Sequence, residues 1–449
     1  MNETEKKPHL KRKVSLFALT MYGVGNILGA GIYALIGQVV GITGNMSWLS
    51  FILAAVTGAL TGLSYAELSA MFPKSAAEFV YTEEAFKIRI VSFILGWIII
   101  FSGLFSATTV AFGFAGYLAS LIGFPSIILI LPIAITLIII LSMINYIGIK
   151  TSTFANIIFT LIEASGLIFI IVIGIPHFGS VDYFQLPISS SFFAIFSSIA
   201  LIFFAYIGFE DIANIAEEVK NPTKNLPRAI IYSLIITTIL YGLTAISVVS
   251  IVDYTVIAGS QEPLAKVAIA AIGPIGGYII SFIALFATAN TVLIMLIVTS
   301  RMMYGMARDK ALPESLARIS KRHKTPALSV FLSMAIVIGL LFLVDIEIVA
   351  HATVFGVLVN FILVNISLIV LRRNKPEMER PFKLKPSLKF VPIIALLGAL
   401  VCIGLLFTFD WITLLINGII ILIGLVVFFL LKLKMKLKLK NKKIKKIID

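Results

Sequence analysis

The chain has 449 residues, of which 59% are hydrophobic and only 13% are charged. Its mean hydropathy is +1.07, and this composition excludes a soluble globular protein because no soluble fold hides so much apolar surface. The net charge of +14 does not indicate nucleic-acid binding, because the basic residues gather in the tails and in alternate loops. The single cysteine, Cys402, excludes a disulfide framework and a cysteine-based metal site. The chain is therefore predicted to be an all-α integral membrane protein.

A hydropathy window of about 19 residues indicates a series of membrane-spanning helices. Twelve candidates lie near 14–40, 46–72, 90–118, 124–146, 152–175, 191–216, 228–252, 272–304, 327–344, 348–371, 389–408 and 411–431. The first apolar run is too long for the core of a signal peptide, so it is interpreted as an uncleaved first span.

Lysine and arginine alternate between the loops. They are frequent in the N-terminal tail, in the C-terminal tail and in the loops after the second, fourth, sixth, eighth and tenth spans. The opposite loops carry mainly acidic residues, with Lys266 as the exception. This pattern predicts that both termini are cytoplasmic and that the chain lies in the plasma membrane. The basic tail at 432–449 is interpreted either as a solvated tail that fixes orientation or as a segment that binds anionic membrane lipid.

The first span contains an unusual stretch from Tyr22 to Tyr33, in which four residues are glycine. Glycine in a helix interior costs roughly 1 kcal/mol relative to alanine, and it lets a second backbone or a ligand come close. A helix that breaks inside the membrane must have its freed amides and carbonyls satisfied by protein, water or ligand. Gly25 and Gly29 also form a GxxxG pair, so helix packing is the alternative interpretation.

The sixth span carries a second candidate break. Between Phe203 and Asp211 it places Gly208 and two carboxylates inside an apolar helix. Interrupted first and sixth helices predict two five-helix repeats of inverted topology, at 14–175 and 191–371, followed by two helices at 389–431 and flanked by cytoplasmic tails at 1–13 and 432–449. In that architecture half-helix N-termini attract an anion and unwound carbonyls attract a cation. An α-amino acid zwitterion carries one charge of each sign.

Several motifs in consistent order resemble those of a known family. They are Gly25 to Tyr33, Ser64 to Leu68 with Met71 to Lys74, Phe203 to Phe209, Ala216 to Pro222 with Leu226-Pro227, Arg301 to Asp309 with Leu312-Pro313, and Arg380 to Phe382. On these residues the chain resembles the amino acid–polyamine–organocation (APC) superfamily of permeases over nearly its whole length, especially the branch near the cationic amino acid transporters. The resemblance implies a leucine-transporter-like fold with ten core helices and two more. It also implies amino-acid transport by alternating access.

The resemblance also assigns substrate contacts. It implies that the substrate carboxylate binds backbone amides around Gly29, Ala30 and Gly31. It implies that the substrate ammonium binds the backbone carbonyls of Phe204, Ala205 and Ile207. Phe209 resembles the family's aromatic gate. Two departures matter: many relatives have serine or threonine where Ala30 stands, and two adjacent glycines of the family are Ala76-Ala77 here, a change expected only to tighten a cytoplasmic loop.

Two carboxylates lie beside the breaks. Glu163 in the fifth span is a charge in hydrocarbon that costs about 3 kcal/mol or more, so it is expected to face the bundle interior. It either exchanges a proton or helps to ligate Na⁺ with Thr288 and Thr291. The alternative is a structural role, as a permanently protonated glutamate hydrogen-bonded to a neighbouring helix. For Glu210 the resemblance implies a proton-responsive or gating group, and the alternative is a cap of the new half-helix. The next residue, Asp211, is expected to face water or a loop.

Other polar residues are weaker candidates. Asn290 is predicted to bridge helices, and small hydroxylated residues of the third span either face the substrate side chain or serve in packing: Ser102, Ser106 and Thr108. The Glu217-Glu218 pair is expected to form ion pairs with nearby basic residues, in a network that Glu67 and Arg301 join.

The sequence thus favours a secondary active amino-acid transporter, with H⁺-coupled uptake and Glu163 or Glu210 as carrier. The alternatives are an amino-acid exchanger and a Na⁺-coupled symporter. A membrane enzyme is disfavoured because the sequence offers no metal-ligand cluster and no Ser/His/Asp set, and a channel because the predicted site is an occluded one. The predicted partners are a small-molecule amino acid, H⁺ or Na⁺, and membrane lipid, with no cofactor. Neutral amino acids are mildly favoured, because no unpaired anionic residue is assigned to the side-chain pocket.

Overall fold

The computed structural model describes residues 10–123, 127–187, 193–260, 262–342 and 346–448; within these ranges the side chains of some residues, Ala30 and Phe204 among them, lie outside the description. The long helices are α1 (Leu16–Thr43), α2 (Ser47–Met71), α4 (Arg89–Leu121), α5 (Ile127–Ile147), α6 (Ile149–Gly174), α9 (Pro222–Ile251), α12 (Pro274–Arg308), α14 (Ile346–Asn374) and α16 (Trp411–Ile448). The shorter ones are α3 (Ala77–Phe86), α7 (Phe193–Phe203), α8 (Asp211–Asn214), α10 (Tyr254–Ile257), α11 (Pro263–Ile272), α13 (Ala327–Leu340) and α15 (Ile393–Leu406). Strands β1 (Ser387–Leu388) and β2 (Val391–Pro392) form an antiparallel hairpin.

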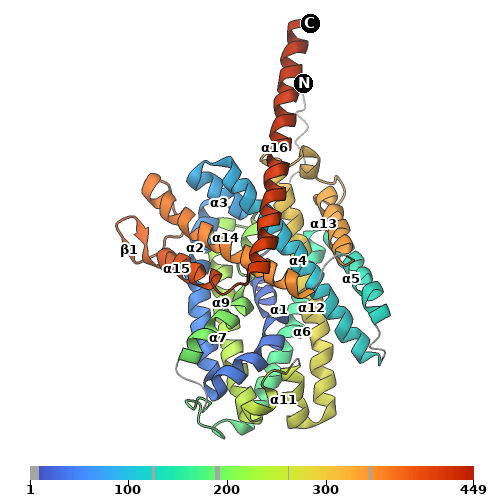
Figure 1. Cartoon of the computed structure of the whole chain (residues 1–449), viewed down its shortest axis with the longest axis vertical. Coiled ribbons are helices and arrows are strands. Elements are labelled where there is room, and N and C mark those ends of the chain that lie inside the picture. Colours follow the sequence, from blue (N-terminus) through green and yellow to red (C-terminus); the bar gives the residue numbers. More distant parts are fainter. Residues whose placement is uncertain (1–9, 124–126, 188–192, 261, 343–345, 449) are drawn as a thin grey trace.

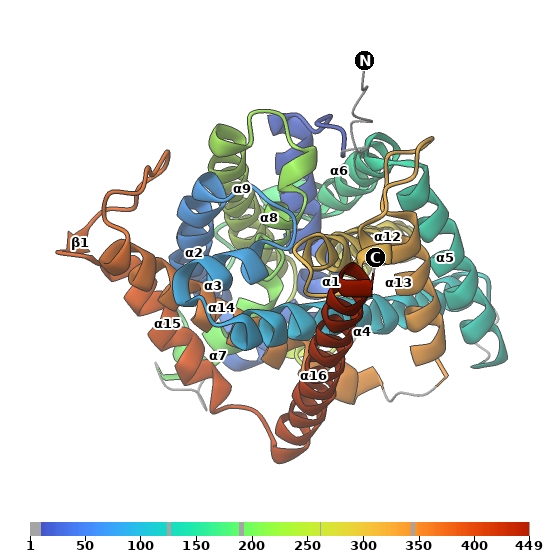
Figure 2. The same ribbon diagram turned by 90° about the horizontal axis from the view of Figure 1, so that it is seen from above.

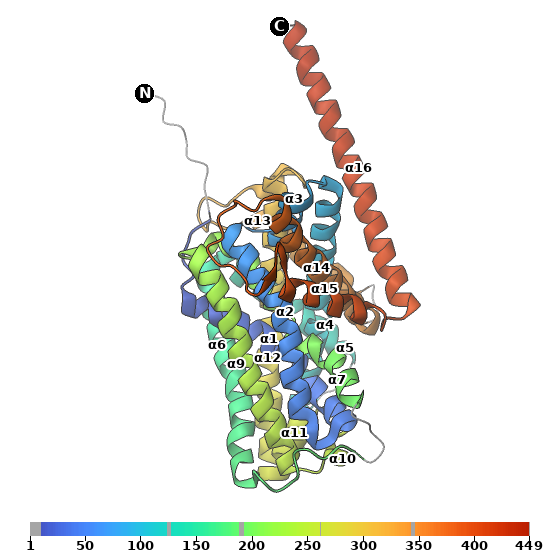
Figure 3. The ribbon, with the colours of Figure 1, turned by 90° about the vertical axis from the view of Figure 1, so that its left-hand side faces the viewer.

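Several of the long helices, α2, α6, α9 and α12 among them, run roughly side by side along one axis, whereas α4 and α14 cross it obliquely (Figure 1). Seen down that axis, α1 and α12 lie near the middle, with α2, α5, α6, α9 and α15 around them (Figure 2). The helix α11 lies at one end of the bundle, whereas α3 and α13 lie toward the other, where α16 projects well beyond the bundle (Figure 3). The central position of α1 follows from its composition, because its apolar and glycine residues let other helices pack on every side.

Nine helices of the described chain are long and apolar enough to cross a membrane. Each of the twelve predicted segments contains a helix, but three of them differ from a simple span. The predicted ninth and eleventh spans are α13 and α15, with 14 residues each, and a helix needs about 20 residues to cross the hydrocarbon core. The predicted sixth span is divided into α7 and α8. The multi-pass helical class is thus confirmed, while the count of twelve spans stays a prediction.

Three helices lie in segments that the hydropathy window assigned to loops. They are α3, α10 and α11, with 10, 4 and 10 residues. Each is too short to produce a spanning signal. Of these, α3 has the greatest consequence, because its first turn reaches the interior of the bundle.

Gly25 is a packing residue, and replacing it with alanine is expected to destabilise the fold. A Cβ at this position would lie 2.0 Å from Thr160 Oγ1 of α6 and 2.4 Å from Asn290 Nδ2 of α12. Overpacking of this kind costs about 1–3 kcal/mol, which thermal unfolding in detergent would detect. Gly113→Ala in α4 is the matched control, because a Cβ there meets nothing within 4 Å. Equal melting temperatures for the two variants would contradict the packing role of Gly25.

Candidate substrate site between two broken helices

The first break lies inside α1. At Gly29 the backbone leaves the helical region, with φ 28° and ψ −159°, before the helix continues to Thr43. Glycine adopts this positive φ without the steric penalty of a side chain. The predicted interruption of the first span is confirmed. Gly25 and Gly29, which the sequence offered as one packing pair, therefore have different roles.

The second break separates α7 from α8. A 3-10 turn, η3 (Phe204–Tyr206), follows α7, and a non-helical turn through Gly208 then leads to α8. Gly208 has φ 128°, a conformation that other residues rarely adopt. A Cβ at Gly208 would lie 3.0 Å from the backbone carbonyl carbon of Asn26. The two breaks are thus in direct contact, as the paired-break prediction requires.

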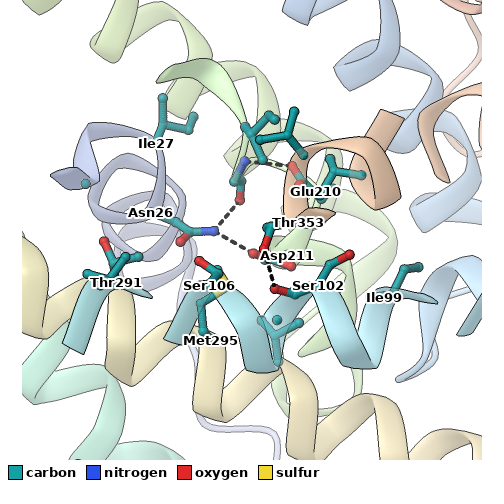
Figure 4. Close-up of a pocket in the computed structure, with 18 of the residues that line it drawn as sticks. Asn26, Ile27, Ile99, Ser102, Ser106, Glu210, Asp211, Thr291, Met295 and Thr353 are labelled. Atoms are coloured by element: carbon teal, nitrogen blue, oxygen red, sulfur yellow. Dashed lines mark hydrogen bonds between the residues drawn. The ribbon is translucent and has the colours of Figure 1, made fainter. Parts of the chain in front are cut away.

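The side chain of Asn26 joins the two breaks. Its Nδ2 donates to the carbonyl of Gly208 at 2.9 Å and to Oδ2 of Asp211 at 2.7 Å, and Figure 4 shows both bonds. Both contacts are buried, so each satisfies a polar group that is removed from bulk solvent. In the sequence, Asn26 stands out only as part of the motif from Gly25 to Tyr33. A lone amide between the glycines of an apolar helix was the available signal.

Tyr241 of α9 reaches the same place from the other side. Its hydroxyl lies 2.6, 3.2 and 3.1 Å from the carbonyl oxygens of Ile27, Leu28 and Ala205. These carbonyls belong to the broken segments, where the regular helical ladder is interrupted. The protein itself therefore satisfies part of the freed backbone, and Ala205, expected to face a substrate ammonium, already has one hydroxyl partner.

A cavity of about 330 Å³ lies where the two breaks meet α4, α12 and α14. Four of the seven residues predicted to bind substrate line it: Gly29, Gly31, Ala205 and Ile207. Ser102 and Ser106 of α4 line it as well (Figure 4). The remaining lining is largely apolar, including Ile99, Val110 and Met295. A mainly apolar cavity with a few convergent polar groups is the usual form of a small-molecule site.

The other predicted substrate residues are placed differently. Phe209 is fully buried, its ring stacks on Phe361 with centroids 5.4 Å apart, and it is not among the described residues that line the cavity. Its role as a gate stays a prediction. Ala30 and Phe204 lie in α1 and η3, but their side chains are outside the described part of the chain.

Two adjacent carboxylates face the cavity from the second break. Glu210 lines it and accepts a hydrogen bond from the backbone amide of Gly208 at 2.8 Å. Asp211 also lines it and is only 6% exposed. The expectation that Asp211 faces water or a loop is therefore wrong, because the short helix α8 turns this side chain inward toward Asn26. The mild preference for neutral substrates therefore loses its basis, because it assumed that no carboxylate faces the cavity.

A third carboxylate, Glu78, lines the same cavity from α3. Glu78 lies between the second and third predicted spans, and hydropathy gives no signal that this segment reaches the interior. The neighbouring Ala76-Ala77 pair is likewise expected from the sequence only to tighten a cytoplasmic loop. The available signal was a single acidic residue directly after two alanines, in a stretch that continues with apolar residues.

Glu163 is buried in α6 and lies outside the cavity lining. Its Oε2 accepts a long bond from Asn290 Nδ2 at 3.5 Å, while its Oε1 is buried without a partner among the described residues. Asn290 bridges α12 to α6, as predicted, because it also donates to Thr160 Oγ1 at 3.1 Å. The hydroxyls of Thr288 and Thr291 donate to carbonyls of their own helix, and only Thr291 lines the cavity.

Two ion pairs lie beyond the second break, and only the Arg301–Glu218 pair is fully buried. Arg301 of α12 bonds both carboxylate oxygens of Glu218 at 3.2 Å, and Glu217 pairs with Arg308. The predicted network of these acids therefore includes Arg301. Glu67 does not join it: it pairs with Arg372 and Arg380, in a separate cluster.

The chain was compared with known proteins on the basis of its sequence. The sequence model of the amino acid permease family matches residues 14–431. The chain belongs to this family. The match covers both broken helices and every residue that lines the cavity. The resemblance found in the motifs is thereby confirmed for the permease family as a whole.

Relatives within the permease family differ in the substrates that their names state. The chain is 31% identical to a branched-chain amino acid permease of Bacillus subtilis (strain 168), over 95% of this chain and 94% of the relative. It is 28% identical to a methylthioribose transporter of the same organism, over 96% and 95%. It is 30% identical to the mitochondrial cationic amino acid transporter 3 of Arabidopsis thaliana, over 81% of this chain and 63% of the relative. Membership of the permease family thus leaves the substrate open.

Proposed function

We propose that this permease is a secondary active amino-acid transporter that works by alternating access and couples uptake to H⁺. The observation that carries the proposal is the meeting of two helix breaks at one cavity, which Glu210 and Asp211 line. Backbone amides and carbonyls freed at such breaks suit the two charged ends of an amino acid. Carboxylates held in an apolar surrounding suit the binding and release of a proton.

The proposal includes an architecture. The segments 14–175 and 191–371 form two inverted repeats of five helices, and 389–431 supplies two more. The positive charge of the loops that follow the even-numbered spans supports a plasma-membrane protein whose tails, at 1–13 and 432–449, lie in the cytoplasm. Lysines in the C-terminal tail would lie where anionic lipid headgroups are found.

The coupling ion is tested by transport under imposed gradients. The purified protein is reconstituted in liposomes, and the accumulation of labelled amino acids is measured with a pH gradient alone and a Na⁺ gradient alone. The proposal expects accumulation under the pH gradient. Accumulation under the Na⁺ gradient alone would identify a Na⁺ symporter, and counterflow without a response to either gradient would identify an exchanger. A thermal-shift screen of the twenty amino acids would select the substrate, since a ligand at 100 times its Kd adds about 2.7 kcal/mol.

Glu210→Gln is expected to abolish accumulation under a pH gradient. Glu210 lines the cavity, whereas Glu163 does not, so we place the coupled proton on Glu210 and expect Glu163→Gln to retain more of the accumulation. The amide keeps the size of the carboxyl but cannot exchange a proton in this range. Loss of accumulation by about tenfold or more is expected, since a positioned proton carrier contributes at least that much.

The control for both variants is Glu262→Gln, because Glu262 is exposed before α11. Full accumulation by Glu210→Gln together with a loss in Glu163→Gln would assign the proton to Glu163. Full accumulation in both variants would show that neither carboxylate carries it.

A further inference from the structure

The short helix α3 holds an acidic side chain against the central cavity. It begins after Ala76, which is fully buried and has φ 58°. The backbone amide of Ala77 donates to Asn214 Oδ1 at 3.0 Å, and that of Ser75 donates to Glu217 Oε1 at 2.9 Å. The start of α3 is therefore fixed to the segment that follows the second break.

The carboxylate of Glu78 is only half satisfied there. Its Oε1 accepts from Tyr65 Oη at 3.1 Å and from Asn214 Nδ2 at 3.2 Å. Its Oε2 is buried without a hydrogen-bond partner in the described part of the chain. Asn360, which donates to Tyr65 Oη at 2.7 Å, also lines the cavity and likewise has a buried Oδ1 without a partner in that part. Two buried acceptors without a hydrogen-bond partner among the described residues therefore lie near each other at the cavity, and a hydrogen-bond donor there would stabilise them.

The charges around Glu78 are mainly negative. Glu78, Glu210 and Asp211 all line the cavity, and none of its described lining residues is lysine, arginine or histidine. Two basic side chains beside α3 are engaged elsewhere: Arg89 pairs with Glu83 and lies over the ring of Phe79, and Arg308 pairs with Glu217, which accepts from the amide of Ser75. Tyr65 and Tyr81 also face this carboxylate. Three carboxylates that share one cavity cannot all be ionised without a counter-charge, so at least one of them holds a proton.

Burial raises the pKa of Glu78 to about 7, against the opposing effect of its hydrogen bonds from Asn214 and Tyr65. The helix α3 is not one of the membrane-spanning segments. It follows α2 in the loop that also carries Lys74, Lys87 and Arg89, which is a predicted cytoplasmic loop. Glu78 thus approaches the cavity from the predicted cytoplasmic side and can change its protonation near neutral pH.

We propose that Glu78 is a second proton site in series with Glu210, and that it passes the coupled proton from the cavity to the cytoplasmic side. This inference rests on the proposed H⁺-coupled function. In the step, the O–H bond on Glu210 breaks and an O–H bond forms on Oε2 of Glu78, through water in the cavity. The negative charge moves from Glu78 to Glu210. Glu78 later releases the proton to cytoplasmic water and is ionised again.

Glu78→Gln tests this role with little change of shape. The amide oxygen can accept the same bonds from Tyr65 and Asn214, and the new NH₂ group replaces the oxygen that has no partner. In reconstituted liposomes we expect accumulation under a pH gradient to fall at least about tenfold, because the chain of proton transfer is interrupted. Substrate-dependent proton entry, followed with a pH dye inside the liposomes, should be lost. Counterflow of labelled substrate should stay within about twofold of the wild type, since exchange needs no net proton transfer.

The matched control is Glu84→Gln on the same helix. Glu84 pairs with Lys375 at 2.9 Å, its side chain is 38% exposed, and it does not line the cavity. It should leave accumulation and counterflow unchanged. If Glu78→Gln accumulates substrate like the wild type, Glu78 carries no coupled proton and the inference is wrong, while the proposed function stands. Loss of counterflow together with accumulation would show that Glu78 has a structural role, which also overturns it. If the wild type does not respond to a pH gradient, the proposed coupling itself fails.

The titration of Glu78 is also expected to make the stability of the folded protein depend on pH. Its pKa is about 7 in the folded protein against an ordinary value of 4.5, so the unfolded chain loses this proton more easily. The stabilising effect of the protonated form is fully present below pH 4.5 and is lost as the pH rises toward 7. The melting temperature of the wild type should therefore fall over this range more steeply than that of Glu78→Gln. Parallel curves would contradict the assigned titration.

Discussion

Replacing Arg301 with methionine is expected to lower the free energy of unfolding by about 3–5 kcal/mol. The side chains of Arg301 and Glu218 are 0% and 1% exposed, and two nitrogens of the guanidinium bond both carboxylate oxygens. Removing the arginine leaves the charge of Glu218 buried without its partner, and Asn145 loses its contact as well. Unfolding of the detergent-solubilised protein by heat or by SDS measures the loss.

Two further variants show whether the unpaired charge is responsible. Arg301→Met combined with Glu218→Met removes both charges and should recover most of the stability, since apolar replacement of a whole buried pair is often neutral. Arg308→Met is the control, because its pair with Glu217 is 30% and 20% exposed and such pairs contribute about 0–1 kcal/mol. An equal loss in Arg301→Met and Arg308→Met would contradict a special role for burial.

The position of this ion pair links it to the transport site. Glu218 follows α8, and its backbone carbonyl accepts from the amides of Lys13 and Val14 just before α1. Val14 in turn pairs with Val219 as an isolated parallel bridge. The residues just before α1 are therefore hydrogen-bonded to the segment that follows α8, and Arg301 connects this segment to α12. A transporter that opens on this side would have to separate these contacts.

The sequence was sufficient for the features that have a local signal. Glycines inside an apolar helix predicted both breaks, because each glycine weakens the helix at its own position. An isolated carboxylate in hydrocarbon predicted a buried Glu163 for a similar reason. Family membership followed from several motifs in consistent order and does not depend on any contact.

Features that depend on distant contacts could not be predicted in this way. The prediction that Glu67 joins the network of Glu217 and Glu218 is wrong, because Glu67 pairs with Arg372 instead. The two residues lie 305 positions apart, and neither segment carries a local signal for the pairing. The prediction that Asp211 faces water or a loop is wrong because its orientation is decided by Asn26, 185 positions earlier. Glu78 gives no signal in a hydropathy window, because α3 has only 10 residues and does not form a span.

Gly208→Ala is expected to reduce transport by about 10- to 100-fold, since strain and crowding of about 1–3 kcal/mol fall directly on the site. The φ of 128° is disfavoured for alanine. The new Cβ would lie 2.8 Å from Asn26 Nδ2 and 3.0 Å from its backbone carbon, so the bonds that join the two breaks would be displaced. Uptake and substrate-induced thermal shift measure the effect.

The control is Gly116→Ala in α4, where a Cβ meets nothing within 4 Å. It should transport like the wild type, because alanine suits a helix interior better than glycine. If Gly208→Ala is folded, binds substrate and transports normally, the contact between the breaks does not hold the site together. If it is folded but has lost the substrate-induced shift, the close approach of Gly208 to Asn26 is what forms the cavity, and the breaks act as one unit.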